Sequence, residues 1–215
     1  MHLRHIMVID PSIINPEISA INNIAMRSPL PLSIHFPGLY GTQSVEYPNG
    51  QTAGIILLGS VASVNDKNEW QGPLQSFIFE ASEKLIPILG ICYGHQLLAH
   101  MFGGKVQSLW KGEKRAGVRK VDLISNHLWD NHQSGKLAYS HEEGVVECPG
   151  GFDVIATSDM VKIDGIASRT KPIWGFQPHL EATEYFLKKR KVTERFSFNF
   201  GYSIIDSFLK YCSSN

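Results

Sequence analysis

The sequence places one cysteine in a setting suited to nucleophilic chemistry. In the segment GICYG, residues 90–94, Cys92 follows an apolar run typical of a strand and precedes a run typical of a helix. The glycines allow a sharp strand-to-helix turn that presents the central side chain at the carboxyl end of a sheet. Amides at the start of the next helix favour a thiolate and stabilise an oxyanion. We predict that Cys92 is a nucleophile; a buried cysteine in a tight turn is the alternative.

A nucleophilic thiol needs a base, and the base needs an acceptor that orients it. Both residue types occur in the segment IWGFQPHLEAT, where His179 and Glu181 are two residues apart. In an extended segment such residues point to the same side. His179 can therefore face Cys92 while Glu181 holds the far imidazole nitrogen. The alternative is a surface histidine followed by a glutamate that the helix dipole favours.

A third candidate element is the segment IILLGSVASV, residues 55–64. Its apolar part predicts a strand, and the strand ends at Gly59 and Ser60. A backbone amide at this position could donate to a developing oxyanion. An ordinary glycine turn after a buried strand explains the same residues.

The first half of the chain contains elements able to position these residues. Short continuous apolar runs at residues 5–10, 53–59 and 84–92 predict strands buried on both faces. Helical spacing predicts helices over residues 68–84 and 95–102. Strands that alternate with helices indicate a parallel sheet with right-handed crossovers.

The second half has short alternating segments separated by turn residues, which predict antiparallel strands that either extend the edge of the sheet or fold over it. These segments are KVQSLW, AGVRKVDLIS, GKLAYSH, FDVIATS and VKIDGIASR. A strand at PIWGFQ then precedes helices over residues 181–191 and 201–211. Residues 28–51 predict a strand at 32–36 and a long loop near the site. The basic stretch 111–120 is interpreted as a solvated hairpin, with a surface patch that docks a partner as the alternative.

We therefore predict a single domain over residues 1–215 of the α/β class. Its architecture is an open, mostly parallel sheet flanked by helices, with an antiparallel edge extension. This architecture resembles the flavodoxin-like sandwich, in which a sheet lies between two layers of helices.

Composition limits the classes of partner. The 20 basic and 20 acidic residues balance, whereas nucleic-acid binding favours a basic excess. Nucleic acid is therefore not expected as a partner. No signal peptide or membrane-spanning stretch is recognised, so a membrane is not expected as a partner either. Three widely spaced cysteines favour a reducing cytoplasm. His95 and His100 lack the spacing of paired zinc ligands, and no metal or cofactor is predicted.

Taken together, these segments resemble the class I glutamine amidotransferase family and, within it, the amidotransferase domain of GMP synthase. The similar stretches are VID, LLGSVASVND, PILGICYGHQLLAHMFGGKV, KGEKRAG, YSHEEGVVECPGGFDVIATSD and IWGFQPHLE. They cover roughly residues 5–190, and their joint order makes the resemblance specific.

The resemblance implies a hydrolase reaction through a cysteine thioester. Cys92 would attack the side-chain amide carbon of glutamine, His179 would transfer the proton to departing ammonia, and Glu181 would orient His179. Backbone amides of Tyr93 and of the Gly59 region would form the oxyanion hole. Water would then release glutamate.

The resemblance also implies that Gln96 and the backbone around Ser140 and His141 grip the amino-acid end of the substrate. Glutamine or another γ-glutamyl amide is thus the expected small-molecule substrate. Because only 34 residues follow Glu181, we expect any synthetase that receives the ammonia to be a separate subunit.

Three positions depart from the family pattern. Pro178 precedes His179, where the family usually has proline after the histidine, so His179 loses a restraint on its backbone. Glu143 stands where aspartate is usual, and Ser60 follows Gly59 where a second glycine is frequent.

Two alternatives to glutamine hydrolysis stay open. The first is a hydrolase of another γ-glutamyl amide, such as a γ-glutamyl peptide. The second is a catalytically weak binding or regulatory subunit, which the altered proline position would permit. The presence of Cys92, His179 and Glu181 argues against the second alternative.

Overall fold

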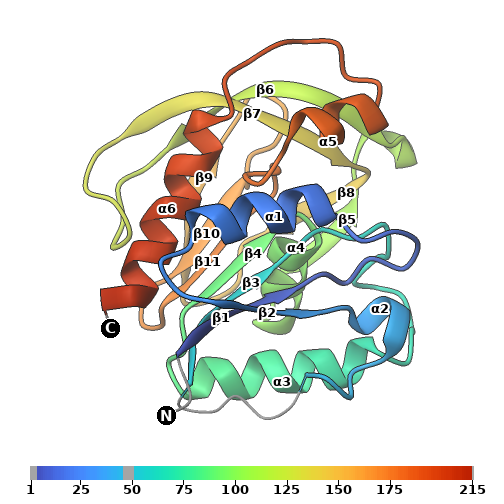
Figure 1. Cartoon of the computed structure of the whole chain (residues 1–215). Helices are drawn as coiled ribbons and strands as arrows, with labels where there is room; N and C mark the ends of the chain where they lie inside the picture. The colour runs from blue at the N-terminus through green and yellow to red at the C-terminus, as the bar shows by residue number, and fades with distance from the viewer. Residues whose placement is uncertain (1–3, 46–50, 215) are drawn as a thin grey trace.

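The apolar runs of the first half of the chain form neighbouring parallel strands in one half of a large sheet (Figure 1). The computed structural model describes residues 4–45 and 51–214. The large sheet has nine strands in the order β2-β1-β3-β4-β11-β10-β9-β6-β7. Its parallel part consists of β1 (His5–Ile9), β2 (Leu32–His35), β3 (Thr52–Leu57), β4 (Ile88–Ile91) and β11 (Ile173–Phe176).

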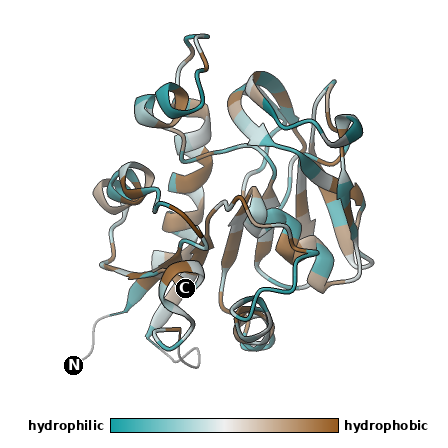
Figure 2. Cartoon of the chain, turned by 90° about the vertical axis from the view of Figure 1, so that its right-hand side faces the viewer, coloured by the Kyte–Doolittle hydropathy of each residue, from teal (hydrophilic) through white to brown (hydrophobic). Residues whose placement is uncertain are grey.

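Helices cover both faces of this parallel part. One face carries α1 (Ile18–Arg27) and α6 (Asn199–Ser214), and the other carries α3 (Gln71–Glu83) and α4 (Tyr93–Met101). Alternate residues of β1 supply the two cores: Ile6 and Val8 pack toward α1 and α6, whereas Met7 and Ile9 pack toward α3 and α4. Burial on both faces explains why these strands read as continuous apolar runs. Figure 2 shows the hydrophobic residues gathered in the central strands.

The second half of the chain extends the sheet with antiparallel strands. The extension consists of β10 (Gly165–Ser168), β9 (Phe152–Thr157), β6 (Arg115–Leu123) and β7 (Gln133–His141). β5 (Lys105–Ser108) and β8 (Glu143–Glu147) form a separate two-stranded sheet. The predicted fold class, a mostly parallel α/β sheet with an antiparallel edge, is confirmed.

Several helix boundaries differ from the prediction. No helix was predicted at residues 18–27, yet α1 forms there because Ile21 and Ile24 make one apolar stripe that covers the sheet. The helix predicted over residues 181–191 shrinks to α5 (Glu184–Lys189), which Thr183 caps by accepting a hydrogen bond from the Phe186 amide. The last helix extends beyond the predicted residues 201–211 at both ends.

The proline-rich segment 28–51 is also more ordered than predicted. After β2 it forms the short helix α2 (Pro37–Tyr40), and residues 46–50 of the predicted loop lie outside the described residues. A 3-10 turn spans Trp110–Gly112 before β6. Among the described residues, no helix is both long and apolar enough to cross a membrane.

Candidate active site

The candidate site lies where β3, β4 and β11 end side by side. Gly59 follows β3, Cys92 follows β4, and the segment 177–181 follows β11. The Cys92 amide donates to the Phe176 carbonyl at 2.8 Å and continues the β4–β11 pairing by one residue. Because parallel neighbours share their carboxyl edge, the three predicted segments meet although they are distant in the sequence.

The turn at Cys92 depends on the two glycines around it. Cys92 has φ 53° and ψ −101°, a conformation that residues with side chains rarely adopt. A Cβ on Gly90 would lie 2.6 Å from the Gly94 carbonyl, and a Cβ on Gly94 would lie 2.3 Å from the Leu57 oxygen of β3. The absence of these side chains lets α4 begin directly after Cys92, so the free amides of its first turn lie next to the sulfur.

His179 and Glu181 form a buried pair beside this turn. Nδ1 of His179 lies 2.7 Å from Oε1 of Glu181, and both side chains are almost fully buried. The His179 amide also donates to the Ala138 carbonyl of β7 at 2.8 Å, an isolated antiparallel bridge. This bridge restrains the His179 backbone without a proline after it. The position of Pro178 therefore does not separate the pair.

The surroundings of His179 favour its protonated form. Burial lowers the pKa of His179, but Glu181 and Cys92 together outweigh this effect and raise the pKa to about 10. A proton on His179 is thus stabilised by the carboxylate on one side and by the sulfur on the other. The arrangement suits a group that holds a proton and then releases it to a leaving amine.

Gly59 lies against both Cys92 and His179. A Cβ on Gly59 would be 3.0 Å from Cε1 of His179 and 3.4 Å from Cβ of Cys92. The hydroxyl of Ser60 donates to the Pro11 carbonyl at 2.8 Å and accepts from the Ala62 amide at 3.1 Å. Ser60 therefore fixes the loop with its side chain and leaves the backbone of the loop next to the site.

The side chain of Tyr93 is used for packing. Its hydroxyl accepts a hydrogen bond from Nε2 of Gln71 at 3.0 Å, and its ring lies 5.8 Å from that of Trp70. Burial raises the pKa of Tyr93 to about 12. Only the backbone amide of Tyr93 is thus left to serve the site.

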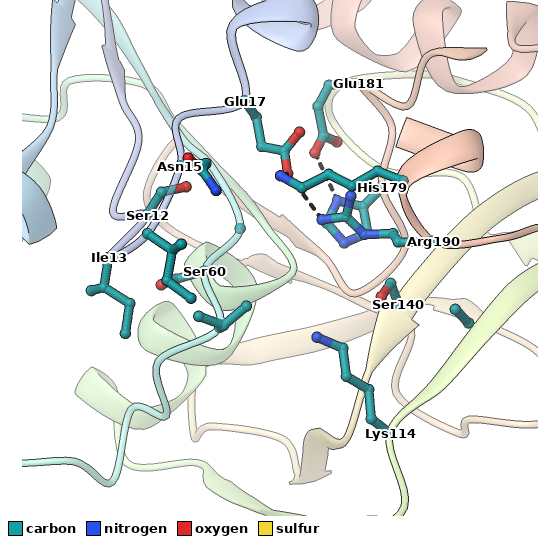
Figure 3. Close-up of a pocket in the computed structure, with 15 residues that line it drawn as sticks. Ser12, Ile13, Asn15, Glu17, Ser60, Lys114, Ser140, His179, Glu181 and Arg190 are labelled. Carbon is teal, nitrogen blue, oxygen red and sulfur yellow. Dashed lines mark hydrogen bonds and ion pairs between the residues drawn. The ribbon is translucent and has the colours of Figure 1, made fainter. Parts of the chain in front are cut away.

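Two cavities adjoin at the candidate site. The one that Cys92 lines, here the cysteine cavity, has a volume of about 190 Å³, and the one that His179 lines, the histidine cavity, has about 420 Å³. Both are lined by Ser60, Val61, Lys114 and Ser140. Figure 3 shows the histidine cavity, with the loop after β1 facing His179, Glu181 and Arg190 across it.

The described residues of segment 28–51 line neither cavity. Gly38 of α2 instead approaches the loop after β1, because a Cβ there would lie 2.7 Å from the Ser12 carbonyl. The predicted strand at 32–36 is thus present as β2, whereas the residues described after it contain the helix α2 and lie behind the histidine cavity without lining it. The segment supports a wall of the histidine cavity from behind.

The residues predicted to grip the substrate lie around the cysteine cavity. Gln96 and His141 line it, and Ser140 lines both cavities. Nε2 of Gln96 donates to the Glu143 carbonyl at 2.8 Å and to Oε1 of Gln177 at 3.1 Å. Gln96 therefore builds the wall with its amide nitrogen. The carboxylate of Glu143 accepts a hydrogen bond from Ser63 at 2.7 Å.

A buried ion pair near the site was missed by the sequence reasoning. Arg119 was placed in a solvated hairpin, but its guanidinium is buried and paired with Asp164. The strand alternation contained the signal, since Arg119 shares the inward face of β6 with Val121 and Leu123. A basic residue in register with core positions indicates a buried partner.

Comparison with protein-family models adds an independent finding. Residues 38–197 match the model of "Glutamine amidotransferase class-I", which covers most of the chain. The chain belongs to this family.

Two relatives of this amidotransferase differ in length. It is 40% identical over 136 residues to a GMP synthase from Ligilactobacillus salivarius, and it spans about a quarter of the length of that relative. It is 33% identical over 167 residues to one subunit of the glutamine-hydrolyzing GMP synthase from Methanocaldococcus jannaschii, covering 76% of each chain.

A solved glutamine amidotransferase from Thermotoga maritima superposes with a TM-score of 0.76 at 19% identity, covering 100% of this chain and 98% of that one. This likeness supports the fold.

Proposed function

We propose that the protein hydrolyses the side-chain amide of glutamine with Cys92 as nucleophile, and that a separate synthetase subunit receives the ammonia. The observation that carries the proposal is the junction of Cys92 with the buried His179–Glu181 pair at the end of three parallel strands. Membership of the amidotransferase family supports the reaction class.

In the first half-reaction the sulfur of Cys92 attacks the amide carbon, and the carbonyl oxygen becomes an oxyanion. Amides of Tyr93 and of the Gly59 loop stabilise this charge. The carbon–nitrogen bond then breaks, and His179 gives its proton to the nitrogen, which leaves as ammonia. Glu181 keeps the imidazole oriented and stabilises its positive charge.

In the second half-reaction water attacks the γ-glutamyl thioester. His179 removes a proton from this water, the carbon–sulfur bond breaks, and glutamate leaves with Cys92 restored. The net change is glutamine and water to glutamate and ammonia. The cysteine cavity, lined by Gln96, Ser140 and His141, holds the glutamyl part. We place the reaction in the cytoplasm, since three widely spaced cysteines do not form the pattern of a disulfide-stabilised secreted protein.

The test is labelling by a glutamine analogue that carries a chloroketone, followed by peptide mass spectrometry. We expect selective labelling of Cys92, protection by free glutamine, and loss of both labelling and glutamate release in Cys92→Ala. Cys148→Ala is the matched control, because Cys148 is partly exposed and lines neither cavity. Unchanged glutamate release in Cys92→Ala would overturn the proposal.

The partner is proposed by analogy with the Methanocaldococcus relative, which is named as one subunit of GMP synthase. We expect glutamine hydrolysis to rise at least tenfold when the GMP synthetase subunit of the same organism is added. An unchanged rate would reject that partner and leave plain hydrolysis.

One observation favours a second candidate, a γ-glutamyl peptide hydrolase. His179 and Glu181 both line the histidine cavity, and its volume of about 420 Å³ is far more than ammonia needs. Comparison of kcat/KM for glutamine and for γ-glutamyl dipeptides separates the two. A preference for dipeptides of tenfold or more would select the second candidate.

A further inference from the structure

A closed circuit of buried hydrogen bonds lies behind Cys92. It includes three residues to which the proposed mechanism gives no role, namely Arg119, Asp164 and Gln177. Asp164 and Gln177 are fully buried, and the Arg119 side chain is 3% exposed. Burying this many polar groups is costly unless each is satisfied, so their arrangement calls for a physical account.

The circuit is anchored by the ion pair between Arg119 and Asp164. The second nitrogen of the guanidinium, Nη1, lies 2.9 Å from Nε2 of His141. Arginine can only donate, so Nε2 of His141 accepts and the ring proton is on Nδ1. Nδ1 then donates to the Glu143 carbonyl at 2.9 Å. Burial and Arg119 lower the pKa of His141 to about 3, which agrees with this neutral form.

The other branch of the circuit ends at the nucleophile. The Glu143 carbonyl can only accept, so Gln96 must present its Nε2 to it, at 2.8 Å. The same nitrogen donates to Oε1 of Gln177, which leaves Nε2 of Gln177 to face Sγ of Cys92 at 3.7 Å. The backbone N–H of Gln177 donates to the backbone carbonyl of Asp164 at 2.8 Å, and this hydrogen bond closes the circuit.

We propose that the Gln177 side chain donates a hydrogen bond to the Cys92 thiolate, and that Arg119 and Asp164 are positioning residues that hold Gln177 in this orientation. The proposal rests on the proposed function, since it concerns the same nucleophile. A donor held in place stabilises a buried anionic sulfur more than water does, because hydrogen bonds to charged atoms are the strong ones.

The direct test replaces Gln177 with methionine, which has a similar shape and no donor. The rate of Cys92 alkylation by iodoacetamide is followed against pH by peptide mass spectrometry, with Cys148 as an internal reference. We expect the midpoint of the Cys92 profile to rise by about one pH unit, the tenfold change that loss of one hydrogen bond to a charged atom produces. Gln107→Met, at an exposed position of β5, should leave the midpoint unchanged.

Gln177→Met and Gln107→Met leave the other charged or titratable residues around Cys92 unchanged. They are His179 after β11, Lys114 and Arg119 near and on β6, and His141, Glu142 and Glu143 between β7 and β8. A shift in Gln177→Met therefore reports the amide donor itself. An unchanged Cys92 midpoint in Gln177→Met would overturn the proposal.

The positioning role is tested with the double variant Arg119→Met/Asp164→Leu. Removing both charges avoids a lone buried ion, which could unfold the chain. In the folded double variant we expect a rise of the Cys92 midpoint that is smaller than in Gln177→Met. If the Cys92 midpoint of the double variant equals that of the wild type, the ion pair does not position Gln177 and its role is only structural.

Failure of the proposed function would look different from failure of this inference. In that case wild-type Cys92 would react no faster than Cys148 at neutral pH, and glutamine would give no glutamate. An active wild type with an unshifted Gln177→Met profile would reject only the hydrogen bond.

Discussion

Three buried histidines show how neighbouring groups decide the charge of a side chain. Burial and Arg119 hold the pKa of His141 at about 3, and burial lowers that of His95 to about 3 as well. His179 is equally buried, but Glu181 and Cys92 raise its pKa to about 10. Opposite charges nearby therefore outweigh desolvation only at His179, the residue that we propose transfers the proton.

The space beside His179 provides the first prediction. Gly59→Ala places a Cβ 3.0 Å from Cε1 of His179, so the imidazole must move by a few tenths of an ångström. We expect kcat/KM for glutamine to fall at least tenfold with little change in Tm, because small displacements at a reacting group are costly. Steady-state kinetics and thermal denaturation measure the two effects.

Gly72→Ala is the matched control for this substitution. A Cβ on Gly72 of α3 meets no atom within 4 Å, so activity should stay at the wild-type level. Wild-type activity in Gly59→Ala would show that the site tolerates a displaced imidazole.

The unit that positions the nucleophile is the junction of β4 with α4. α4 begins at Tyr93 directly after Cys92, and the close contact of Gly94 with Leu57 links it to β3. The helix therefore cannot shift along the strand without collision. This fixed junction holds Cys92 at φ 53°, a conformation that a flexible loop would abandon.

The second prediction concerns this contact between α4 and β3. Gly94→Ala would put a Cβ 2.3 Å from the Leu57 backbone oxygen, which no side-chain rotation can relieve. We expect the free energy of unfolding to fall by about 3 kcal/mol, the upper range for overpacking, and activity to fall with it. Urea denaturation measures the change.

Gly150→Ala provides the comparison at a position where a Cβ meets no atom within 4 Å. We expect it to unfold at the same urea concentration as the wild type. Equal stability of both variants would mean that α4 can move away from β3.

The buried neutral histidines affect the stability of the whole molecule. A folded pKa of about 3, below the usual 6.5, means that the unfolded chain binds more protons between these pH values. Stability is therefore lost as pH falls below about 6.5. His179 acts in the opposite sense: its raised pKa stabilises the fold at low pH, and this contribution is lost as pH rises toward about 10.

The third prediction follows from His95, which is fully buried in α4 against Gly175. At pH 5 this histidine binds a proton in the unfolded chain but not in the folded one. The free energy of unfolding is therefore lower at pH 5 than at pH 7, by on the order of 2 kcal/mol. We expect His95→Gln to reduce the loss of unfolding free energy between pH 7 and pH 5 by this amount. Urea denaturation at the two pH values gives the difference.

The matched variant is His100→Gln on the exposed side of the same helix. It should retain the pH dependence of the wild type. An identical pH dependence in His95→Gln and wild type would show that His95 becomes protonated without unfolding.

The sequence by itself determined most of the elements and the proposed reacting residues. Glycines around Cys92, the two-residue spacing of His179 and Glu181, and continuous apolar runs are local features, and their physical consequences do not depend on distant residues. The strands and their mostly parallel order were predictable for this reason. α1 was missed because it has a single narrow apolar stripe, and burial of that stripe against the sheet is what stabilises the helix.

Only the tertiary structure decided which distant groups share one environment. The bridge from His179 to Ala138 replaces the restraint that a proline would give, and the inward turn of Arg119 brings it to Asp164. The pKa of a histidine and the orientation of a buried side-chain amide such as that of Gln177 depend on such neighbours. The order of the strands brings these neighbours together. Spacing along the chain carries no record of these neighbours, because they belong to elements that meet only after folding.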